Sequence, residues 1–245
     1  MSEIRISTES IRSVAERMRG CADRMSSIEA NTNSATKLIE NGVTNSSIGN
    51  MRSKMTALRN KVKTLHSNLE ANYELLMKTV RVFELADKKL KEDQALDLVI
   101  EKYNKKEKID ISSYPRKRNG VRSNGVGYYF LYEDGCTWYA FSRWSEVNGK
   151  DPVFAGHPGN ASNWANSIDK NAMNCVSTSV ENSIVANAIA VNSVGGNHVV
   201  YIEGVRDGMV YFSESAYSNP SIAGRISAKP IEQFRSEFEY IITSK

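Results

Sequence analysis

One cysteine of this chain, Cys136, stands between Gly135 and Thr137 where an aromatic run with helical spacing begins, formed by Trp138, Phe141 and Trp144. Asp134 or Gly135 can cap such a helix, so that the thiol falls in its first turn. Unpaired backbone N–H groups and the helix dipole favour negative charge there, and the thiolate is the nucleophilic form of cysteine. This run alone fits a reactive cysteine and a small buried cysteine equally well.

A base and a carboxylate for this thiol are available from a hairpin nearer the C-terminus. His198 begins an alternating apolar segment, and Asp207-Gly208 is a two-residue turn signal before a second strand that leads to Glu214. Pairing places the two strands side by side, although their register is not set by the sequence. If the helix of Cys136 packs on this sheet, the three side chains form a nucleophilic Cys–His–acid constellation.

The elements that must position these residues follow a simple order. A short helix is expected over 160–167, and strands over 183–191, 198–205, 209–212 and 234–242. Helices that precede a run of antiparallel strands indicate an α+β domain, with the helices packed on an antiparallel sheet.

The first hundred residues have a different periodicity. Two rows of mostly apolar residues recur every seven positions: Ile11, Met18, Met25, Thr32 and Ile39, then Val14, Cys21, Ile28 and Ala35. Turn-forming residues follow at 41–47. A second pattern then runs through Met55, Val62, Leu69, Leu76, Phe83 and Leu90, accompanied by Met51, Leu58 and Leu65 before the companion row shifts to Tyr73 and Val80. The spacing predicts two long helices in an antiparallel hairpin, the second of more than about fifty residues.

Such a hairpin buries little surface, so we expect a partner helix pair or self-association. A plain stalk or dimerisation arm is the alternative. The charge-rich stretch from 88 to 118 and the extended conformation that Pro115 imposes on Tyr114 indicate a linker. The predicted layout is a hairpin at 1–105, a linker at 106–119 and a catalytic domain at 120–245.

The bulk composition excludes several classes of protein. The chain has 245 residues, 40% of them hydrophobic, and a net charge of +4, which is too mild to indicate nucleic-acid binding. Three cysteines and three histidines form no metal-ligand spacing, so no metal or cofactor is expected. The N-terminal residues do not form a secretory signal peptide, and no apolar run is long enough for a transmembrane segment.

The C-terminal half resembles the CHAP family of cysteine-dependent amidases and peptidases, which have a papain-like fold. The resemblance covers about 120–245. It is carried by Gly135-Cys136-Thr137-Trp138-Tyr139-Ala140, Asn160-Ala161-x-x-Trp164-Ala165, Asn197-His198-Val199-Val200-Tyr201-Ile202-Glu203 and Phe212-Ser213-Glu214. It implies that Cys136 is the nucleophile, His198 the base and Glu214 the orienting acid. It also implies that the substrate is peptidoglycan, cut at an amide bond in or next to the stem peptide.

Two positions depart from the family pattern. Gly135 stands where the family usually has Gln, and Ala216 stands where a family Asn commonly follows the acid by two residues. The loss of that Asn removes part of the polar network around the histidine. These departures keep open a wall-binding module without activity beside the enzyme.

The hairpin resembles the helical WXG-type proteins and related N-terminal domains that bacteria export by the type VII route. The resemblance is carried by the length of the hairpin, by Ser47-Ile48-Gly49 at its turn and by Phe83-Glu84-Leu85-Ala86-Asp87, which is similar to the export signal of that family. It implies a protein that is secreted or associated with the cell wall, with a small helical partner. An immunity protein is a further expected partner if the enzyme is a toxin. A wall-remodelling enzyme and a phage-type lytic enzyme are the alternative roles.

Overall fold

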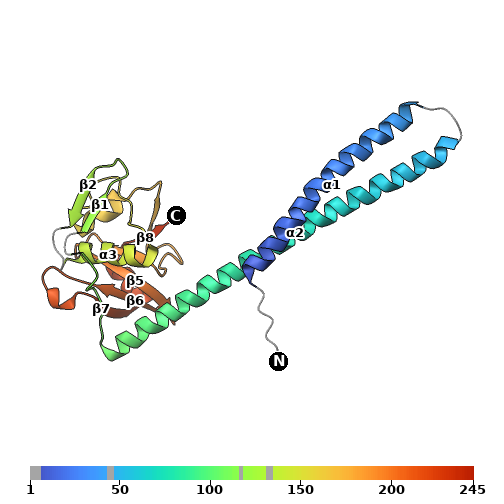
Figure 1. The fold of residues 1–245 in the computed structure, drawn as a ribbon. Coiled ribbons are helices and arrows are strands. Elements are labelled where there is room, and N and C mark those ends of the chain that lie inside the picture. The colour runs from blue at the N-terminus through green and yellow to red at the C-terminus, as the bar shows by residue number, and fades with distance from the viewer. Residues whose placement is uncertain (1–6, 43–46, 116–117, 131–134) are drawn as a thin grey trace, which may run out of the picture. The chain divides into compact units, whose positions relative to one another are not determined.

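The computed structural model describes residues 7–42, 47–115, 118–130 and 135–245. Its contacts divide the chain into two compact units, Met1–Glu92 and Asp93–Lys245. Helix α2 (Ser47–Lys105) contributes residues to both (Figure 1). The layout predicted from the sequence, with limits after residues 105 and 119, stays a prediction. In the part of the chain that the structure describes, no helix combines the length and the apolar character needed to cross a membrane.

The first unit is an antiparallel helical hairpin, as the heptad spacing predicts. Helix α1 (Thr8–Gly42) packs along the first part of α2 (Figure 1). Arg12 near the start of α1 pairs with Glu84, whereas Glu29 further along α1 contacts His66. Contacts that run in opposite directions along the two helices define the antiparallel arrangement.

The seam between these helices is shifted by one residue from the predicted pattern. The row Ile11, Met18, Met25, Thr32 and Ile39 is at least partly buried, as expected. Its companion row on α1 contains the buried Ala15, Ala22 and Thr36, whereas the predicted Val14 and Ile28 are 39% and 45% exposed. On α2 the companions of Val62, Leu69 and Leu76 are His66, Tyr73 and Val80, of which Tyr73 and Val80 are as predicted, whereas Met51, Leu58 and Leu65 are exposed. Small alanine side chains let the two helices approach closely, which explains why Ala15 and Ala22 lie in the seam in place of the larger Val14 and Ile28.

The polar residues inside this seam are satisfied within their own helix. The Thr32 hydroxyl donates to the Ile28 carbonyl oxygen at 2.8 Å, and the Thr36 hydroxyl donates to the Thr32 carbonyl oxygen at 2.8 Å. Neither hydroxyl therefore depends on the partner helix for a hydrogen bond.

The second unit is built on a six-stranded antiparallel sheet, so the expected α+β class is confirmed. Its strand order is β3-β8-β4-β5-β6-β7. The strands are β3 (Met173–Ser177), β4 (Ala188–Asn192), β5 (His198–Arg206), β6 (Met209–Glu214), β7 (Arg225–Pro230) and β8 (Tyr240–Ser244). A separate pair consists of β1 (Arg118–Val121) and β2 (Gly127–Phe130).

Helices cover the sheet through two apolar clusters. Helix α3 (Cys136–Asn148), the short η1 (Ala161–Asn163) and α4 (Trp164–Ser167) contribute to the first, which includes the fully buried Trp144 and Trp164. Helix α5 (Ile231–Glu237) contributes Phe234 to the second. A short turn, η2 (Pro220–Ile222), precedes β7. Alternation along β5 supplies both clusters: Val199 and Tyr201 belong to the first, Val200 and Ile202 to the second.

The strand predicted over 234–242 is wrong in its first half. Residues 234–237 belong to helix α5, and β8 begins only at Tyr240. Aromatic residues favour strands on average, but Phe234 and Phe238 are four residues apart and stack with ring centroids 4.5 Å apart, which is helical spacing.

The last turns of α2 pack against β5, β6 and β7 of the second unit. Leu96, Val99, Ile109 and Ile226 form a small buried cluster there. Arg206 of β5 pairs with Asp97. Beyond the helix, the Ile109 N–H donates to the Gly224 carbonyl oxygen at 2.8 Å, and Lys108 forms an isolated bridge with Arg225.

Gly224 is expected to tolerate no side chain. Its φ is +77°, and a Cβ atom there would lie 2.4 Å from the Ile109 carbonyl oxygen. We expect Gly224→Ala to cost about 1–2 kcal/mol for the left-handed backbone, and more for the displaced contact. Gly125→Ala is the matched control, because Gly125 has a φ of +81° but open space around it. Denaturation of both variants separates the two costs, and equal losses would contradict the close approach.

Candidate active site

Helix α3 places Cys136 in its first turn, as the sequence predicts. Gly135 is the N-cap, with extended backbone and no side-chain capping bond, whereas Asp134 lies outside the described residues. The aromatic residues that follow anchor the helix, since Trp138, Phe141 and Trp144 are all buried. Cys136 itself is partly exposed. The thiol is therefore held at the positive end of a firmly packed helix.

Strands β5 and β6 bring His198 and Glu214 together. Their register pairs Tyr201 with Ser213, so Glu214 lies opposite Val200, two residues from His198 along the same face. The His198 Nε2 atom is 3.2 Å from Glu214 Oε2. A hydrogen bond also joins the His198 imidazole to the Cys136 thiol. The structure thus brings all three predicted side chains into one chain of contacts.

The pKa shifts of the three contacting side chains favour an ionised Cys136–His198 pair. Burial alone would raise the pKa of the Cys136 thiol, but the hydrogen bond and positive charge of His198 outweigh it and lower the pKa. Burial works against a charged His198, yet its bonds to Cys136 and Glu214 raise its pKa to about 9. Burial opposes the Glu214 charge as well, but donors from His198, Arg225 and Ser227 lower its pKa to about 2. These shifts all favour a thiolate beside an imidazolium, supported by a carboxylate.

Alkylation of Cys136 tests this ionised pair directly. We expect iodoacetamide to modify Cys136 readily at pH 6, and a His198→Ala variant to react far more slowly there because it lacks the stabilising imidazolium. Cys175 is the internal control, since burial raises the pKa of its thiol. Peptide mass spectrometry assigns the label to each cysteine. A Cys136 that reacts no faster at pH 6 than Cys175 would contradict the ion pair.

The linkage to stability has a definite sign. The pKa of His198 is raised above the value of 6.5 that an unperturbed histidine has, so its stabilising contribution is complete below that pH and disappears as the pH rises through about 9. The pKa of Glu214 is depressed, so its contribution is complete above 4.5 and disappears as the pH falls through about 2. The contributions of His198 and Glu214 are therefore both complete between about pH 5 and 6, whereas that of Cys136, whose pKa is lowered, increases as the pH rises above this range.

An open cleft of about 400 Å³ gives access to these groups. Its lining comprises Gly135, Cys136, Thr137, Asn160, Ala161, Gly196, Asn197, His198, Ala216, Tyr217 and Ser218. The cleft is bordered by the start of α3, by the loop before β5 and by the loop after β6. Trp138 and Trp164 are 2% and 0% exposed, so they belong to the core beneath the cleft.

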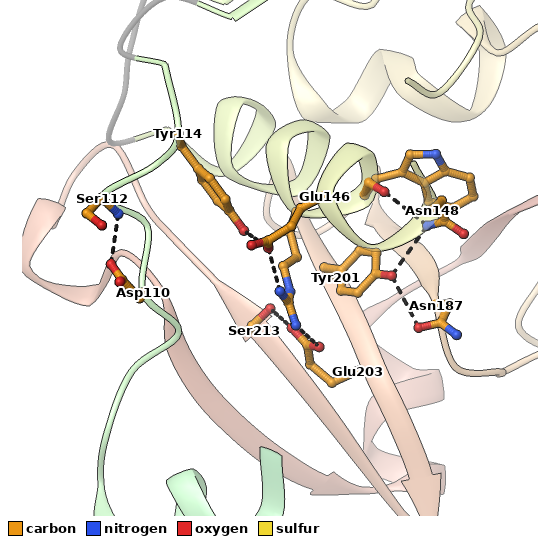
Figure 2. Close-up of polar contacts among 11 residues, drawn as sticks. Asp110, Ser112, Tyr114, Glu146, Asn148, Asn187, Tyr201, Glu203 and Ser213 are labelled. Atoms are coloured by element: carbon orange, nitrogen blue, oxygen red, sulfur yellow. Dashed lines mark hydrogen bonds and ion pairs between the residues drawn. The ribbon is translucent and has the colours of Figure 1, made fainter. Parts of the chain in front are cut away.

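A buried ion pair fixes α3 to the sheet behind the cleft. Arg143 lies seven residues after Cys136, and its guanidinium binds both carboxylate oxygens of Glu203, with distances of 2.9 and 2.8 Å. Ser213 donates to Glu203 at 2.5 Å, and Tyr114 donates to Glu146, which also binds Arg143 (Figure 2). The network connects the helix that carries the thiol with the two strands that carry the base and the acid.

A bulge in β5 aims Glu203 into this network. Ile202 pairs with Phe212 and Gly204 with Tyr211, so Glu203 is the extra residue between them. The Glu203 side chain is only 4% exposed. The sequence analysis assigned no role to Arg143 or Glu203. The signal was present, since Glu203 is a charged residue inside the otherwise apolar run from Val199 to Val205, and such a residue needs a partner when it is buried.

Two further residues that the sequence analysis did not identify hold the acid. Arg225 and Ser227 of β7 both donate to Glu214 Oε1. Within the described residues, no group of three or more His, Cys, Asp or Glu side chains has the arrangement of a metal site.

Two crystal structures of Ly7917, one of them with the hydrolyzing product of MDP, are similar to this chain, with 20% and 21% identity and TM-scores of 0.36 and 0.35. Each similarity covers 45% of this chain and just over half of the Ly7917 chain, 54% and 53%. No curated protein matches.

The family comparison concerns the residues around the cleft. The matched segment lies outside the hairpin, whose resemblance to WXG-type proteins therefore stays a prediction. The matched segment includes Cys136, His198 and Glu214 together with Arg143 and Glu203. Residues 123–216 match the family model described as the CHAP domain, and the chain therefore contains a CHAP domain.

Proposed function

We propose that this protein is a peptidoglycan hydrolase that cuts an amide bond in or next to the stem peptide. Cys136 is the nucleophile, His198 the base and Glu214 the acid that orients the imidazole. The observation that carries the proposal is the continuous contact from sulfur to imidazole to carboxylate beside an open cleft, in a chain that contains a CHAP domain. The CHAP resemblance supplies the substrate class.

The reaction follows from the resting charges. The Cys136 thiolate attacks the amide carbonyl carbon, so a carbon–sulfur bond forms and the oxygen becomes an oxyanion. As the carbon–nitrogen bond breaks, the His198 imidazolium gives its proton to the leaving amine. Neutral His198 then takes a proton from water, which attacks the thioester. The products are a carboxylate and an amine, and the thiolate–imidazolium pair is restored.

Stabilisation of the oxyanion falls to the start of α3. Its first backbone N–H groups have no partner within the helix, and that of Cys136 is the natural donor. Gly135 offers no side-chain donor in place of the family Gln, so the oxyanion site relies on backbone groups and on neighbouring cleft residues such as Asn160. This departure affects the rate rather than the mechanism.

Digestion of purified peptidoglycan tests the proposal. We expect the full chain to release muropeptides with one new amine and one new carboxyl group per cut, identified by mass spectrometry. The position of the new amine identifies the bond. Binding to peptidoglycan without any release supports the alternative of a wall-binding module and overturns the enzyme.

We also infer that the hairpin associates with other helices through one of its sides. This apolar side comprises Val14, Cys21 and Ile28 of α1 and Leu58 and Leu65 of α2. Given the observed seam, both sets occupy the heptad position that flanks the seam on the same side of an antiparallel pair. The ion pair of Arg12 with Glu84 marks the opposite, polar side. Leu58 and Leu65 are both 49% exposed, which leaves an apolar strip without a cover in this chain.

Charge around the apolar side indicates what covers it. The neighbouring heptad positions contain Arg17 and Arg24 on α1 and Lys54 and Lys61 on α2, all exposed. A second copy would bring these like charges together, so a small acidic helical protein fits better than self-association. Light scattering separates the two, because a second copy doubles the mass of 27.3 kDa. Association that survives Leu58→Lys combined with Leu65→Lys would overturn the role of this side.

Because peptidoglycan lies outside the cytoplasm, an enzyme that cuts it must be exported to the cell wall. We propose export by a type VII-like route, as a toxin or a wall-remodelling enzyme, which the resemblance of the hairpin supports. Cell fractionation of a producing strain with and without its secretion machinery tests this. Release only on lysis favours the phage-type lytic enzyme instead. Protection of the producing strain by a co-expressed neighbouring gene identifies an immunity protein.

A further inference from the structure

The two oxygens of Glu214 have different partners. Oε2 faces His198 Nε2 at 3.2 Å. Oε1 accepts three hydrogen bonds from β7: from Arg225 Nη2 at 2.8 Å, from Arg225 Nε at 3.2 Å and from Ser227 Oγ at 2.8 Å. Because a carboxylate is planar, fixing one oxygen fixes the direction of the other. The donors on β7 therefore determine how Oε2 meets the imidazole.

The pairing of β6 with β7 places Arg225 and Ser227 beside Glu214. Glu214 and Arg225 are directly paired across β6 and β7, and Ser227 follows two residues later on the same face. Arg225 also forms a bridge with Lys108 on its other side, and the Gly224 N–H donates to the Glu214 carbonyl oxygen at 3.0 Å. The base of the arginine is thus held from both sides, although its side chain is 50% exposed.

The position expected to support the histidine network carries no donor. Ala216, two residues after the acid, lines the cleft and offers only a methyl group. The polar support that a side chain there would give is absent, and the bonds to the acid come from β7 instead.

We propose that Arg225, assisted by Ser227, is a positioning residue that turns the Glu214 carboxylate toward His198. The proposal rests on the proposed function, since it gives a role to the triad of that reaction. Arg225 is not one of the residues that line the cleft, and its hydrogen bonds to the triad go to Glu214, so it acts through Glu214.

The charged groups that contact Glu214 come from two strands. His198 of β5 lies on one oxygen and Arg225 of β7 on the other, and Cys136 of α3 lies beyond the imidazole. Donors to an ionised carboxylate lower its pKa, and here the pKa of Glu214 is lowered to about 2 despite burial. Removal of the arginine therefore raises this pKa and lets the carboxylate rotate.

Rate–pH profiles of Arg225→Met in the full chain test the proposal. We expect kcat to fall about tenfold with little change in KM, and the acidic limb of the profile to move upward by about one pH unit. Arg225→Lys keeps the charge but loses the paired Nε and Nη2 donors. It should therefore return the acidic limb of the profile to its wild-type position but recover only part of kcat. Arg235→Gln is the matched control, because Arg235 forms an ion pair with Glu232 on α5, and it should change neither quantity.

Alkylation of Cys136 near pH 6 gives a readout that needs no substrate. A misdirected carboxylate stabilises the imidazolium less, so we expect Arg225→Met to alkylate several-fold more slowly. Loss of a positive charge alone would favour the imidazolium and speed the reaction, so slower alkylation identifies lost positioning.

The outcomes separate this proposal from the proposed function. If the wild type releases no muropeptides, the proposed hydrolase activity is overturned. If Arg225→Met is nevertheless alkylated more slowly than that wild type, the role of Arg225 in positioning Glu214 is supported. Unchanged kcat, pH profile and alkylation in a folded Arg225→Met overturn the positioning role. A loss of rate that is uniform across pH, with normal alkylation, also overturns it, since that pattern reports a merely structural residue.

Discussion

Cys136→Ala is expected to reduce muropeptide release by at least about a thousandfold. The sulfur forms the covalent bond to the substrate carbonyl, and alanine leaves His198 with nothing to activate except water. The fold should persist, because Cys136 is partly exposed and the helix behind it is anchored by buried aromatic residues. Release of new amines from purified peptidoglycan measures the effect.

Cys175→Ala is the matched control for this loss. Cys175 lies on β3 and packs against the apolar cluster around Trp164, away from the cleft lining. The same substitution there should leave the rate within about threefold of the wild type. Substantial hydrolysis by Cys136→Ala, or an equal loss in both variants, would remove Cys136 from the mechanism.

Glu203→Gln is expected to lower the free energy of unfolding of the second unit by about 3–5 kcal/mol. The change removes the charge that faces the buried Arg143, whose guanidinium then lacks its bidentate partner. It also weakens the acceptor for Ser213, next to Glu214. Because the pair joins α3 to β5, activity should fall together with stability. Chemical denaturation followed by tryptophan fluorescence measures the change.

Glu146→Gln provides the control at the exposed end of the same network. The Glu146 side chain is 42% exposed, so its loss should cost less than about 1 kcal/mol. Replacing both members of the buried pair, with Arg143→Met and Glu203→Leu together, should recover part of the stability lost by Glu203→Gln alone, since no uncompensated charge remains. If Glu203→Gln and Glu146→Gln destabilise equally, the buried pair is not what fixes the helix.

The meeting of the three candidate side chains could be predicted because the segments that carry them have local signals. Cys136 begins a helix whose aromatic spacing is visible in the sequence, and His198 and Glu214 flank a hairpin with a recognisable turn. The two-residue turn predicts that their strands lie side by side, whereas the register, which the bulge at Glu203 shifts, comes from the structure.

The supports of the site could not be predicted, because they depend on contacts between distant strands. Nothing near Arg225 in the sequence indicates that β7 pairs with β6 so that it meets Glu214. The bulge that turns Glu203 inward likewise has no local signature beyond Gly204. In the hairpin, heptad spacing gave the right helices but the wrong companion row, since both Val14 and Ala15 repeat every seven residues and only packing selects the alanine.

The threonines inside the hairpin have a mechanical consequence. Thr32 and Thr36 hydrogen-bond to carbonyl oxygens of their own helix, so parting the two helices leaves neither hydroxyl without a partner. Only a narrow strip of side chains becomes exposed to water when the helices part. A pulling force that opens this pair from its ends would meet little resistance and could unzip it one turn at a time. The β-sheet has no comparable route, because each of its inner strands exchanges backbone hydrogen bonds with two neighbours.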